Sequence, residues 1–426
     1  MPAIRADLPH VVVIGGGFAG LWATRALAWA PVRITLVDRT NHHLFQPLLY
    51  QVATAGLSAT DIAAPLRHIL RRQRNVEIRL AEAERIDPQA RTVAFADGGT
   101  LRYDYLLLAT GATHSYFGNE QWAPHAPGLK SLDDALDLRR KMLLAFERAE
   151  ACEDPVERAA WLDFAIVGGG PTGVELAGTL AEIARHTLRD QFKNIDPASA
   201  RVRLIEAGPR VLSSFPEDLS EKARRQLEQL GVEVSTDVPV TAIDAGGYRL
   251  GDTYVRARTL IWAAGVAASP LSRSLGVPLD RAGRVPVEPD LSVPGHPEIF
   301  VAGDLAAVQR EDGSPVPGVA PAAKQMGSHV ARVLQARLQG APARPFHYRD
   351  YGNLATIGRR AAVVDLRGLR FSGAPAWWFW LAAHVFFLIG FRNRIAVLSN
   401  WAWAYWSRQR AARIILGRRR EPASRD

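Results

Sequence analysis

Cysteine is nearly absent from this sequence, since Cys152 is the only one among 426 residues. A single thiol cannot form a disulfide within the chain, so a disulfide-supported fold is excluded and a reducing compartment is expected. Cys152 lies in a polar stretch, where an ordinary solvated thiol is the simplest interpretation. Any redox chemistry of this chain must therefore proceed without a pair of cysteines.

Acidic residues are also in the minority, because 43 Asp and Glu residues face 52 Lys and Arg residues, for a net charge of +9. No stretch combines basic and aromatic residues in the manner of a nucleic-acid-binding module. We therefore expect no nucleic-acid partner and assign the excess positive charge to contact with a membrane surface. Residues 1–10 also lack the charged-then-apolar pattern of an export signal.

A glycine-rich stretch near the N-terminus, VVVIGGGFAG at residues 11–20, has the order strand, tight turn and helix. Gly15 allows the sharp turn, Gly17 allows the backbone to approach a pyrophosphate, and Gly20 allows the helix to pack closely on the strand. The positive end of the helix then faces the phosphates. A second apolar run ends at Asp38, whose carboxylate can bind ribose hydroxyls. The complete set predicts a dinucleotide site rather than an ordinary glycine-rich turn.

The same arrangement recurs further along, where a strand leads into Gly168, Gly170 and Gly173 and a later strand ends at Glu206. Two complete copies predict two dinucleotide sites, and hence electron transfer between two cofactors. A free carboxylate at Glu206 repels a 2′-phosphate, so this site should prefer NADH over NADPH. Three nearby arginines weaken that preference: Arg201, Arg203 and Arg210.

Two further apolar strands run into small residues, LLLATG at 106–111 and LIWAAG at 260–265. Small residues let the backbone lie against a flat cofactor, and the likeness indicates that the two halves are internal duplicates. A third strand ends in Gly303 and Asp304, where the glycine permits close approach and the carboxylate can bind a polyol hydroxyl.

Hydrophobic residues make up 48% of the chain, which is enough for a large core and for two or three domains. Helical periodicity predicts helices at 62–70, 131–151, 219–230 and 319–338. Short strands are predicted at 76–83, 91–95, 354–357 and 361–365, with a hairpin turn at Asp97-Gly98-Gly99. Residues 41–58 are interpreted as a buried connector.

The C-terminal part has a different character, because residues 371–391 carry no permanent charge and are rich in Trp and Phe. A second aromatic run covers 395–406, and arginines follow. The length suits a membrane span of about 20 residues, but Pro375 and the Trp cluster are typical of an interface. We expect helices that lie in one leaflet, with arginines on an anionic surface. A span and a buried or dimer-forming helix pair are the alternatives.

Several stretches together resemble the type II NADH:quinone oxidoreductases, which are single-chain, non-pumping enzymes of the membrane surface. These stretches are FQPLLYQVATAGLS, GGGPTGVELAGTL, WAAGV, YGNLATIGRRAAV and GFRNRIAV, and the resemblance runs over nearly the whole chain. It implies an α/β fold with two Rossmann-like dinucleotide-binding domains of the glutathione-reductase type and a C-terminal membrane-associating helical segment. The implied domains are an FAD-binding domain at 1–115 and 275–340, an NADH-binding domain at 116–274 and a membrane-surface region at 341–426.

The resemblance implies that FAD takes hydride from NADH and passes two electrons to a membrane quinone, without proton pumping. It also implies a peripheral location on the cytoplasmic face of the inner membrane, through an anionic surface contacted by residues 371–420. A homodimer is a further expected partner, and no metal ligand is expected.

The resemblance assigns site residues as well. The FAD-binding set is Gly15, Gly16, Gly17, Phe18, Ala19, Gly20, Asp38, Arg39, Phe45, Gln46, Pro47, Ala83, Thr110, Gly111, Gly303, Asp304, Ala320, Pro321 and Ala322. The NADH-binding set is Gly168, Gly170, Pro171, Thr172, Gly173, Glu206 and Gly265.

Glu175 is the expected catalytic residue, since the resemblance places a Glu here beside the nicotinamide and the flavin. The alternative is an acid favoured at a helix start by the helix dipole. The segment 320–325 resembles the quinone-site motif Ala-Gln-x-Ala-x-Gln, with Pro321 in place of the first Gln. Pro321, Lys324 and Gln325 are therefore expected to line the quinone opening, against the alternative of a helix start with Pro in its first turn. Lys324 faces either the flavin or solvent.

Two other functions remain open at this point. Disulfide reductases and sulfide:quinone oxidoreductases of this fold relay electrons through paired cysteines, which this chain lacks. A soluble reductase of a ferredoxin-like or rubredoxin-like carrier, or an NADH oxidase, is one alternative, but the Trp- and Arg-rich residues 371–420 argue against it. A flavin-binding redox sensor without turnover is the other, and two intact cofactor motifs argue against that.

Overall fold

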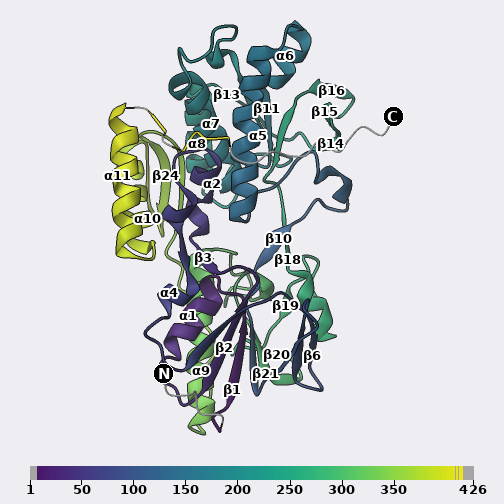
Figure 1. The fold of residues 1–426 in the computed structure, drawn as a ribbon, viewed down its shortest axis with the longest axis vertical. Coiled ribbons are helices and arrows are strands. Elements are labelled where there is room, and N and C mark those ends of the chain that lie inside the picture. The colour runs from purple at the N-terminus through teal and green to yellow at the C-terminus, as the bar shows by residue number, and fades with distance from the viewer. Residues whose placement is uncertain (1–6, 408, 411, 416–426) are drawn as a thin grey trace. The chain divides into compact units, whose positions relative to one another are not determined.

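The computed structural model describes residues 7–407, 409–410 and 412–415, and Figure 1 shows their course. The chain divides into two compact units. Unit 1 consists of Met1–Leu44, Ala63–Thr113 and Val266–Tyr351, and unit 2 of Phe45–Ile62, His114–Gly265 and Gly352–Asp426. Unit 2 thus includes both an early segment and the C-terminal region. Compactness does not reveal which cofactor a unit binds, so the expected cofactor domains stay a prediction.

Unit 1 is built on a mainly parallel sheet in the order β20-β21-β9-β1-β2-β5, whose edge strand β20 runs antiparallel to β21. Every residue of β1 is buried, as expected for a strand covered on both faces. Helices α1 and α9 pack against each other. The bounds are β1 His10–Ile14, β2 Arg33–Asp38, β5 Val76–Leu80, β9 Tyr105–Leu108, β20 Ser292–Val293, β21 His296–Val301, α1 Phe18–Ala26 and α9 Ala320–Leu338.

Smaller elements complete unit 1. An antiparallel meander consists of β6 Ala83–Asp87, β7 Thr92–Phe95 and β8 Thr100–Arg102. β19 Val285–Pro286 pairs with β22 Ala306–Ala307, while β10 Ala112–His114 and β18 Val266–Ala268 lie where the chain passes from one unit to the other. The hairpin turn at Asp97-Gly98-Gly99 is as predicted, and the run 76–83 is divided between β5 and β6.

The helix expected over 62–70 is wrong. Residues Ala63–Pro65 form strand β4, which pairs with β3 (His42–Leu44), and only the short helix α4 (Leu66–Ile69) follows. Pro65 explains the break, because proline disfavours the helical conformation in the residue before it and donates no hydrogen bond.

Unit 2 repeats the design of unit 1 with a parallel sheet in the order β13-β12-β11-β17. Its longest helix, α5, begins with a capping box in which Ser131 and Asp134 satisfy each other's backbone N–H groups. An antiparallel meander, β14-β15-β16, follows β13. The bounds are α5 Leu132–Ala151, α6 Pro155–Trp161, β11 Asp163–Val167, α7 Pro171–Glu182, β12 Arg201–Ile205, α8 Glu217–Gln229, β13 Val232–Ser235, β14 Val240–Ile243, β15 Gly247–Leu250, β16 Thr253–Arg256 and β17 Thr259–Trp262.

The rest of unit 2 packs around α7. The antiparallel sheet of β23 (Asn353–Gly358), β24 (Ala361–Leu366) and β25 (Leu369–Ser372) contacts α7, and helix α10 (Ala374–Phe387) covers β24. Helix α11 (Phe391–Ser407) follows, and Figure 1 shows it beside α10. The early segment adds α2 (Leu49–Ala53) and α3 (Ala59–Ile62), so the stretch 41–58 is partly helical rather than only a connector.

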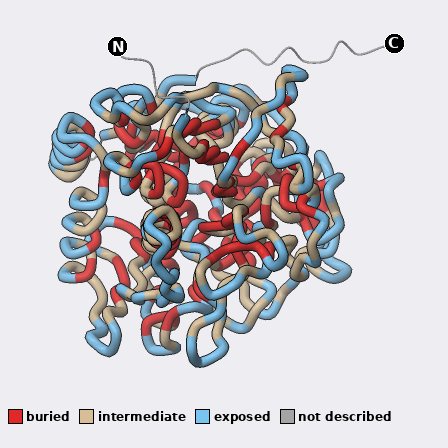
Figure 2. Tube along the Cα trace, turned by 90° about the horizontal axis from the view of Figure 1, so that it is seen from below, coloured by how far each residue is buried: buried red, intermediate tan, exposed pale blue. Residues whose placement is uncertain are grey.

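Buried residues follow the strands and the inner faces of the helices, and the chain's outer turns are exposed (Figure 2). The core of unit 2 contains large buried side chains such as Tyr248, Phe146 and Trp380. Within the described part of the chain, no helix combines the length and apolar character needed to cross a membrane.

Candidate active site

The first glycine turn, in unit 1, is closed toward the sheet and open on its outer side. Gly15 has φ +104°, and a Cβ on it would lie 2.3 Å from the Ala109 carbonyl oxygen. A Cβ on Gly20 would lie 1.9 Å from the Gly15 carbonyl oxygen. By contrast, Gly17 caps α1, is exposed and has no atom within 4 Å of its Cβ position. The turn therefore leaves space for a pyrophosphate at the helix N-terminus.

Polar groups gather around this turn because β1, β2, β9 and β21 are parallel and end at one edge. Asp38 accepts from Gly16 N at 2.6 Å and from Thr40 N at 2.7 Å. Thr110 has a buried hydroxyl without a hydrogen-bond partner among the described residues, which fits a missing ligand atom. Asp304 follows β21 at the same edge. These groups fit FAD.

Other residues assigned to FAD lie outside this group. Arg39 is exposed and faces Glu82, with 3.8 Å between Nη1 and Oε1, and Ala83 begins β6. Phe45, Gln46 and Pro47 belong to unit 2. The Phe45 ring meets His384 of α10 edge-on at 6.3 Å between centroids, and Gln46 Nε2 donates to the Lys130 carbonyl oxygen at 3.3 Å.

The second glycine turn, in unit 2, has nearly the same geometry. Gly168 has φ +112°, and a Cβ on it would lie 2.5 Å from the Ala263 carbonyl carbon. A Cβ on Gly173 would lie 1.9 Å from the Gly168 carbonyl oxygen, whereas Gly170 faces open space. Pro171 and Thr172 form the exposed first turn of α7, and Gly265 follows β17, beside the Phe117 ring.

Glu206 is held by the backbone, since Oε2 accepts from Gly169 N at 2.5 Å and Oε1 from Gly208 N at 2.7 Å. The three arginines that could favour a 2′-phosphate are bonded elsewhere. Arg210 donates to the carbonyl oxygens of Ser213 and Phe215, Arg201 pairs with Glu233, and Arg203 pairs with Asp163 and Glu233. The geometry therefore favours the carboxylate of Glu206 as the charge that faces the ribose.

Glu175 lies in α7, two residues after Gly173, and is 8% exposed. Burial raises its pKa well above the usual value, and a hydrogen bond from the Thr356 backbone of β23 opposes this only in part. The close approach of β23 depends on Gly178, where a Cβ would lie 1.7 Å from the Ile357 carbonyl oxygen. Glu175 is consequently a buried acid whose charged form is disfavoured, not a solvated helix-start carboxylate.

The predicted quinone-site segment begins α9, with Pro321 in its first turn between Ala320 and Ala322. Lys324 is partly buried against aromatic rings, since its ammonium lies 4.4 Å from the Trp22 ring centroid and 5.1 Å from that of Phe18. Burial lowers its pKa to about 8. Gln325 donates to and accepts from the backbone of Arg349, at 2.8 and 2.9 Å, so its amide anchors the segment before β23.

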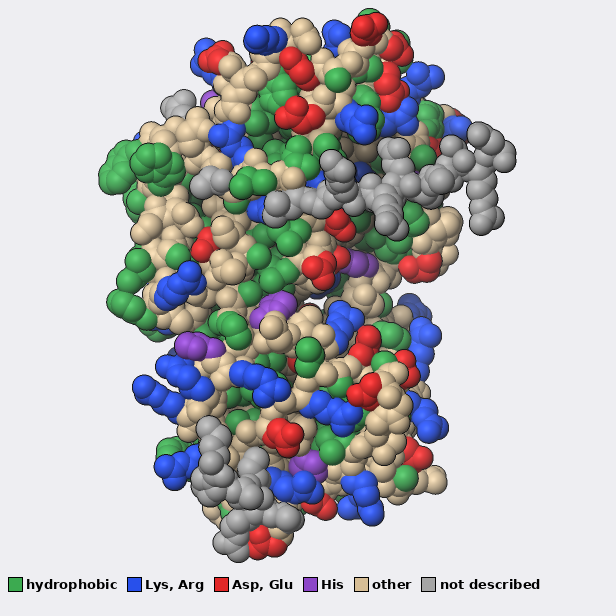
Figure 3. Space-filling model, viewed as in Figure 1, with side chains coloured by type: hydrophobic (Ala, Val, Ile, Leu, Met, Phe, Trp, Pro, Cys, Tyr) green, Lys and Arg blue, Asp and Glu red, His purple; other side chains and the backbone are tan. Residues whose placement is uncertain are grey.

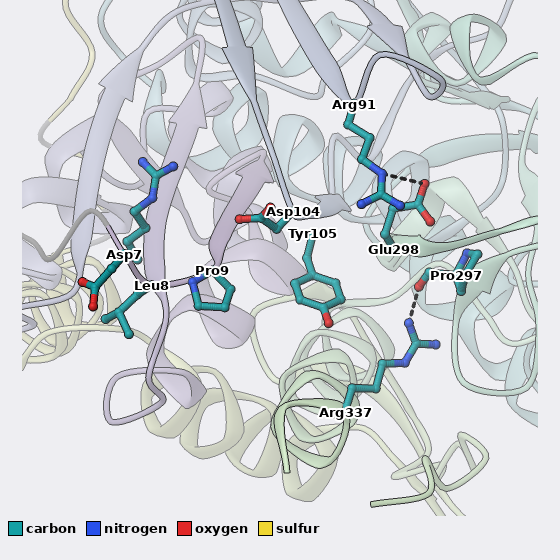
Figure 4. A pocket seen from close by; sticks show the side chains of 10 residues that line it. Asp7, Leu8, Pro9, Arg91, Asp104, Tyr105, Pro297, Glu298 and Arg337 are labelled. Atoms are coloured by element: carbon teal, nitrogen blue, oxygen red, sulfur yellow. Dashed lines mark hydrogen bonds and ion pairs between the residues drawn. The ribbon is translucent and has the colours of Figure 1, made fainter. Parts of the chain in front are cut away.

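A polar pocket of about 610 Å³ lies at the opposite, amino edge of the unit 1 sheet (Figure 4). Several of its charged side chains are engaged with protein groups: Arg91 faces Glu298 at 3.8 Å, Arg337 pairs with Asp290 at 2.6 Å, and Asp104 accepts from His10 N at 2.6 Å. Parallel sheets bind nucleotides at their carboxyl edge, so this pocket is not part of the redox site.

Comparison with known proteins agrees with this geometry. Residues 9–327 match the pyridine nucleotide-disulphide oxidoreductase family, and residues 351–407 match the NDH2 C-terminal domain. A type II NADH:quinone oxidoreductase of Mycobacterium tuberculosis is 47% identical over 95% of this chain and 90% of its own length. A second one from that organism is 46% identical over 97% of this chain and 91% of its own length. The chain belongs to the type II NADH:quinone oxidoreductases.

Membership in this family confirms the expected fold class, enzyme class and cofactor pair, FAD and NADH. The fold also matches the structure of NDH2 from Plasmodium falciparum in complex with NADH, with a TM-score of 0.88 and 20% identity over 96% of this chain and all of the other. The roles of individual residues are not tested by these likenesses and stay predictions.

Some residues near the predicted site escaped the sequence reasoning. Tyr50 is buried in α2, which contacts the helix of Glu175, and the partly buried His384 meets the Phe45 ring. Arg410, expected on a membrane surface, instead pairs with Glu182 of α7 at 3.3 Å, its side chain 16% exposed. Tyr50 stands inside the stretch FQPLLYQVATAGLS and could have been found there, whereas no local signal marks Arg410. Arg408, Arg418, Arg419 and Arg420 lie outside the described residues.

Proposed function

We propose that this chain oxidises NADH at unit 2, holds FAD in unit 1 and reduces a quinone delivered by a membrane. The observation that carries the proposal is the pair of glycine turns, each closed toward its sheet and open on its outer side, in a chain without paired cysteines. Bound FAD supplies a flavin that accepts hydride and returns electrons to an acceptor, so the protein has to bind, orient and shield the reactants.

The backbone N–H groups at the start of α1 bind the FAD pyrophosphate in this proposal, and Asp38 binds a ribose. Asp304 and the unpartnered Thr110 hydroxyl provide further polar contacts. In unit 2 the start of α7 binds the NADH pyrophosphate and Glu206 binds its ribose. Because the Glu206 carboxylate repels a 2′-phosphate, NADH is the preferred donor.

Glu175 acts as a neutral acid in this scheme. Burial disfavours the charged form of its carboxyl group and raises its pKa, which favours the protonated form. A protonated carboxyl can donate a hydrogen bond to the bound nicotinamide without trapping the positively charged product by ion pairing. The residue therefore orients NADH while allowing release.

Lys324 is the proposed proton source on the quinone side. Quinone reduction consumes protons, and an ammonium with a pKa near 8 can supply one from Nζ at neutral pH. The rings of Phe18 and Trp22 hold this ammonium in place. Pro321 shapes the first turn of α9 in place of an amide side chain, so quinone affinity is the property that this substitution affects.

A membrane docks, in our proposal, on the aromatic face of α10 and α11. Figure 3 shows hydrophobic side chains gathered along the edge that Figure 1 labels with these helices. Their exposed members are Trp378, Phe379, Phe386, Phe387, Phe391, Ile395, Leu398, Trp403 and Trp406. Exposed Arg392 and Arg394 supply positive charge beside them. Tryptophan next to arginine is typical of an interfacial helix, so we assign this face to the cytoplasmic membrane surface rather than to a second copy of the chain.

Stopped-flow spectroscopy of the purified flavoprotein tests the redox proposal. NADH should bleach the flavin absorbance, and a subsequent quinone should restore it under anaerobic conditions. Bleaching without recovery by quinone would indicate a reductase of a protein carrier, and no bleaching would indicate a sensor.

Vesicle sedimentation tests the docking face. Phe386→Ser combined with Trp406→Ser should lower binding to anionic vesicles about tenfold or more, because each buried aromatic contributes about 1.5–3 kcal/mol. Trp29→Ser is the matched control, since Trp29 is 97% exposed but belongs to unit 1. Unchanged vesicle binding of the double variant, with loss of a dimer in analytical ultracentrifugation, would assign the face to self-association instead.

A further inference from the structure

The segment after the last helix folds back onto α2 and α7 within unit 2. Arg410 pairs with Glu182 of α7 at 3.3 Å, and its Nη1 donates to the Thr54 carbonyl oxygen at 3.4 Å. Gly56 provides the space, because a Cβ there would lie 3.0 Å from the same Nη1. The side chains of Arg410 and Glu182 are only 16% and 17% exposed. A buried ion pair of this kind is costly to break once one partner is lost.

A second connection runs from α11 to the same short helix. Trp401 Nε1 donates to Gln51 Oε1 at 2.7 Å, and Gln51 Nε2 donates to the Tyr50 hydroxyl oxygen at 2.9 Å. Tyr50 is 4% exposed. The C-terminal region thus holds α2 at both its ends, through Tyr50 and through Thr54.

Tyr50 lies in the electrostatic field of both the catalytic acid and the buried ion pair. Burial raises the pKa of its phenol well above the usual value, and an ionised Glu175 would raise it further, while Gln51 and Arg410 lower it and Glu182 raises it. Arg410 has no comparable direct effect on Glu175, whose pKa reflects burial and the Thr356 backbone. Arg410 reaches the surroundings of Glu175 through its contacts with Thr54, which follows α2, and with Glu182 of α7.

We propose that Arg410 is a positioning residue for the reaction: it fixes α2 against α7, the helix that carries Glu175, so that α2 with its buried Tyr50 helps to exclude water from the Glu175 carboxyl group. The inference rests on the proposed role of Glu175. It assigns to the C-terminal segment a part in NADH oxidation that is separate from membrane contact.

Kinetics of Arg410→Gln give the first test. The variant should lower kcat about tenfold, as expected when a reacting group is misplaced, and Arg410→Lys should recover most of the loss by restoring the charge. Arg413→Gln is the control for loss of an arginine from this segment, because Arg413 bonds to Gln191 Oε1 at 2.7 Å and to the Arg410 backbone carbonyl at 3.0 Å, so the variant leaves the Arg410 guanidinium and its pairing with Glu182 in place. If Arg410→Gln folds poorly with Glu182 left unpaired, Arg410→Gln with Glu182→Gln removes both charges and should show the same loss of kcat.

A double-mutant cycle with Tyr50→Phe tests the route. The losses should be strongly non-additive, since both variants disturb one structural element. Additive losses, or equal losses for Arg413→Gln, would overturn the proposal.

Infrared spectroscopy gives a readout independent of turnover. The carbonyl band of the protonated acid, identified by its absence in Glu175→Gln, should persist to high pH in the wild type and in Arg413→Gln. In Arg410→Gln it should disappear at lower pH, because water then reaches the carboxyl. An unchanged titration would refute the positioning role. If NADH does not reduce the flavin of the wild-type protein, the proposed function is refuted. The infrared titration still decides the role of Arg410 in that case.

Discussion

The two glycine turns have closely similar local geometry. The helices that follow them, α1 and α7, differ in the side chains that they carry and in the elements that pack on them. Both turns begin with a glycine at positive φ, +104° at Gly15 and +112° at Gly168, and both end with a glycine whose Cβ would lie 1.9 Å from the first carbonyl oxygen. Both acids, Asp38 and Glu206, accept from the middle of their turn. Nucleotide binding alone explains these shared features.

The differences begin two residues after the last glycine. In α1 this position is Trp22, which holds the Lys324 ammonium, and in α7 it is Glu175, which is buried under β23. The close contact also differs, because α9 approaches α1 through its own Gly327, whereas α7 itself supplies Gly178 to admit β23. The same strand–turn–helix unit thus occurs twice. In unit 1 the Lys324 ammonium packs on its helix, and in unit 2 its helix carries the buried acid Glu175.

The largest expected effect comes from adding a methyl group to the last glycine of each turn. Gly20→Ala should abolish FAD binding, because the Cβ would overlap the Gly15 carbonyl oxygen. Gly173→Ala should leave FAD bound and abolish NADH binding. Flavin absorbance and NADH titration separate the two outcomes, and normal NADH affinity in Gly173→Ala would break the equivalence of the turns.

Glu175→Gln should retain FAD and lower turnover with NADH about tenfold or more, the lower range of effects for a group that acts in proton transfer or orientation. The matched substitution in the other copy, Trp22→Phe, should leave flavin reduction by NADH nearly unchanged and affect the quinone step. Stopped-flow traces of each half-reaction measure this, and unchanged kinetics of Glu175→Gln would remove Glu175 from the mechanism.

Glu206→Gln should reduce the preference for NADH over NADPH about tenfold, since a hydrogen bond to a charged group contributes about 1.5–3 kcal/mol. Asp38→Asn is the control and should affect FAD retention without changing that preference. The ratio of kcat/KM values for the two donors is the measurement. Equal use of both donors by the wild type would show that the neighbouring arginines dominate.

The smallest effect concerns stability against pH. Burial raises the folded-state pKa of Glu175, so above about pH 4.3, the ordinary pKa of Glu, the unfolded chain releases a proton that the folded chain retains. This group therefore destabilises the fold as pH rises, by up to about 1.4 kcal/mol per pH unit until the folded pKa is reached. Glu175→Gln lacks this term and should gain Tm relative to the wild type from pH 5 to pH 8. A constant difference would mean that Glu175 ionises normally.

Patterns within a few residues of each other were sufficient to predict much of this molecule. The turns at Gly15 and Gly168, the acids at Asp38 and Glu206 and the helix over 131–151 all follow from local spacing. Contacts between residues far apart in the sequence could not be predicted from such local patterns. Pro65 is a local signal against a helix, but nothing local shows that Ala63–Pro65 pairs with β3 or that Gln325 bonds to the Arg349 backbone.

Arg410 is the clearest failure of local reasoning. An arginine after an aromatic helix is expected at a lipid headgroup, but Glu182, far away in the sequence, provides a buried partner for it. Charge and composition report the preference of a residue for a kind of environment, and only the tertiary fold decides which available environment it occupies.

The contact of Thr356 with Glu175 limits how the chain can be shortened for experiments. The Thr356 backbone that bonds to Glu175, the proposed catalytic acid, belongs to the same stretch of chain that leads to α10 and α11, the helices that we propose dock on a membrane. Trimming the chain ahead of β23 would therefore remove the strand that covers Glu175 together with the proposed membrane-docking helices, so it is unsuitable for preparing a protein for inhibitor screening. Replacing outward-facing tryptophans and phenylalanines one by one is the safer route to such a reagent.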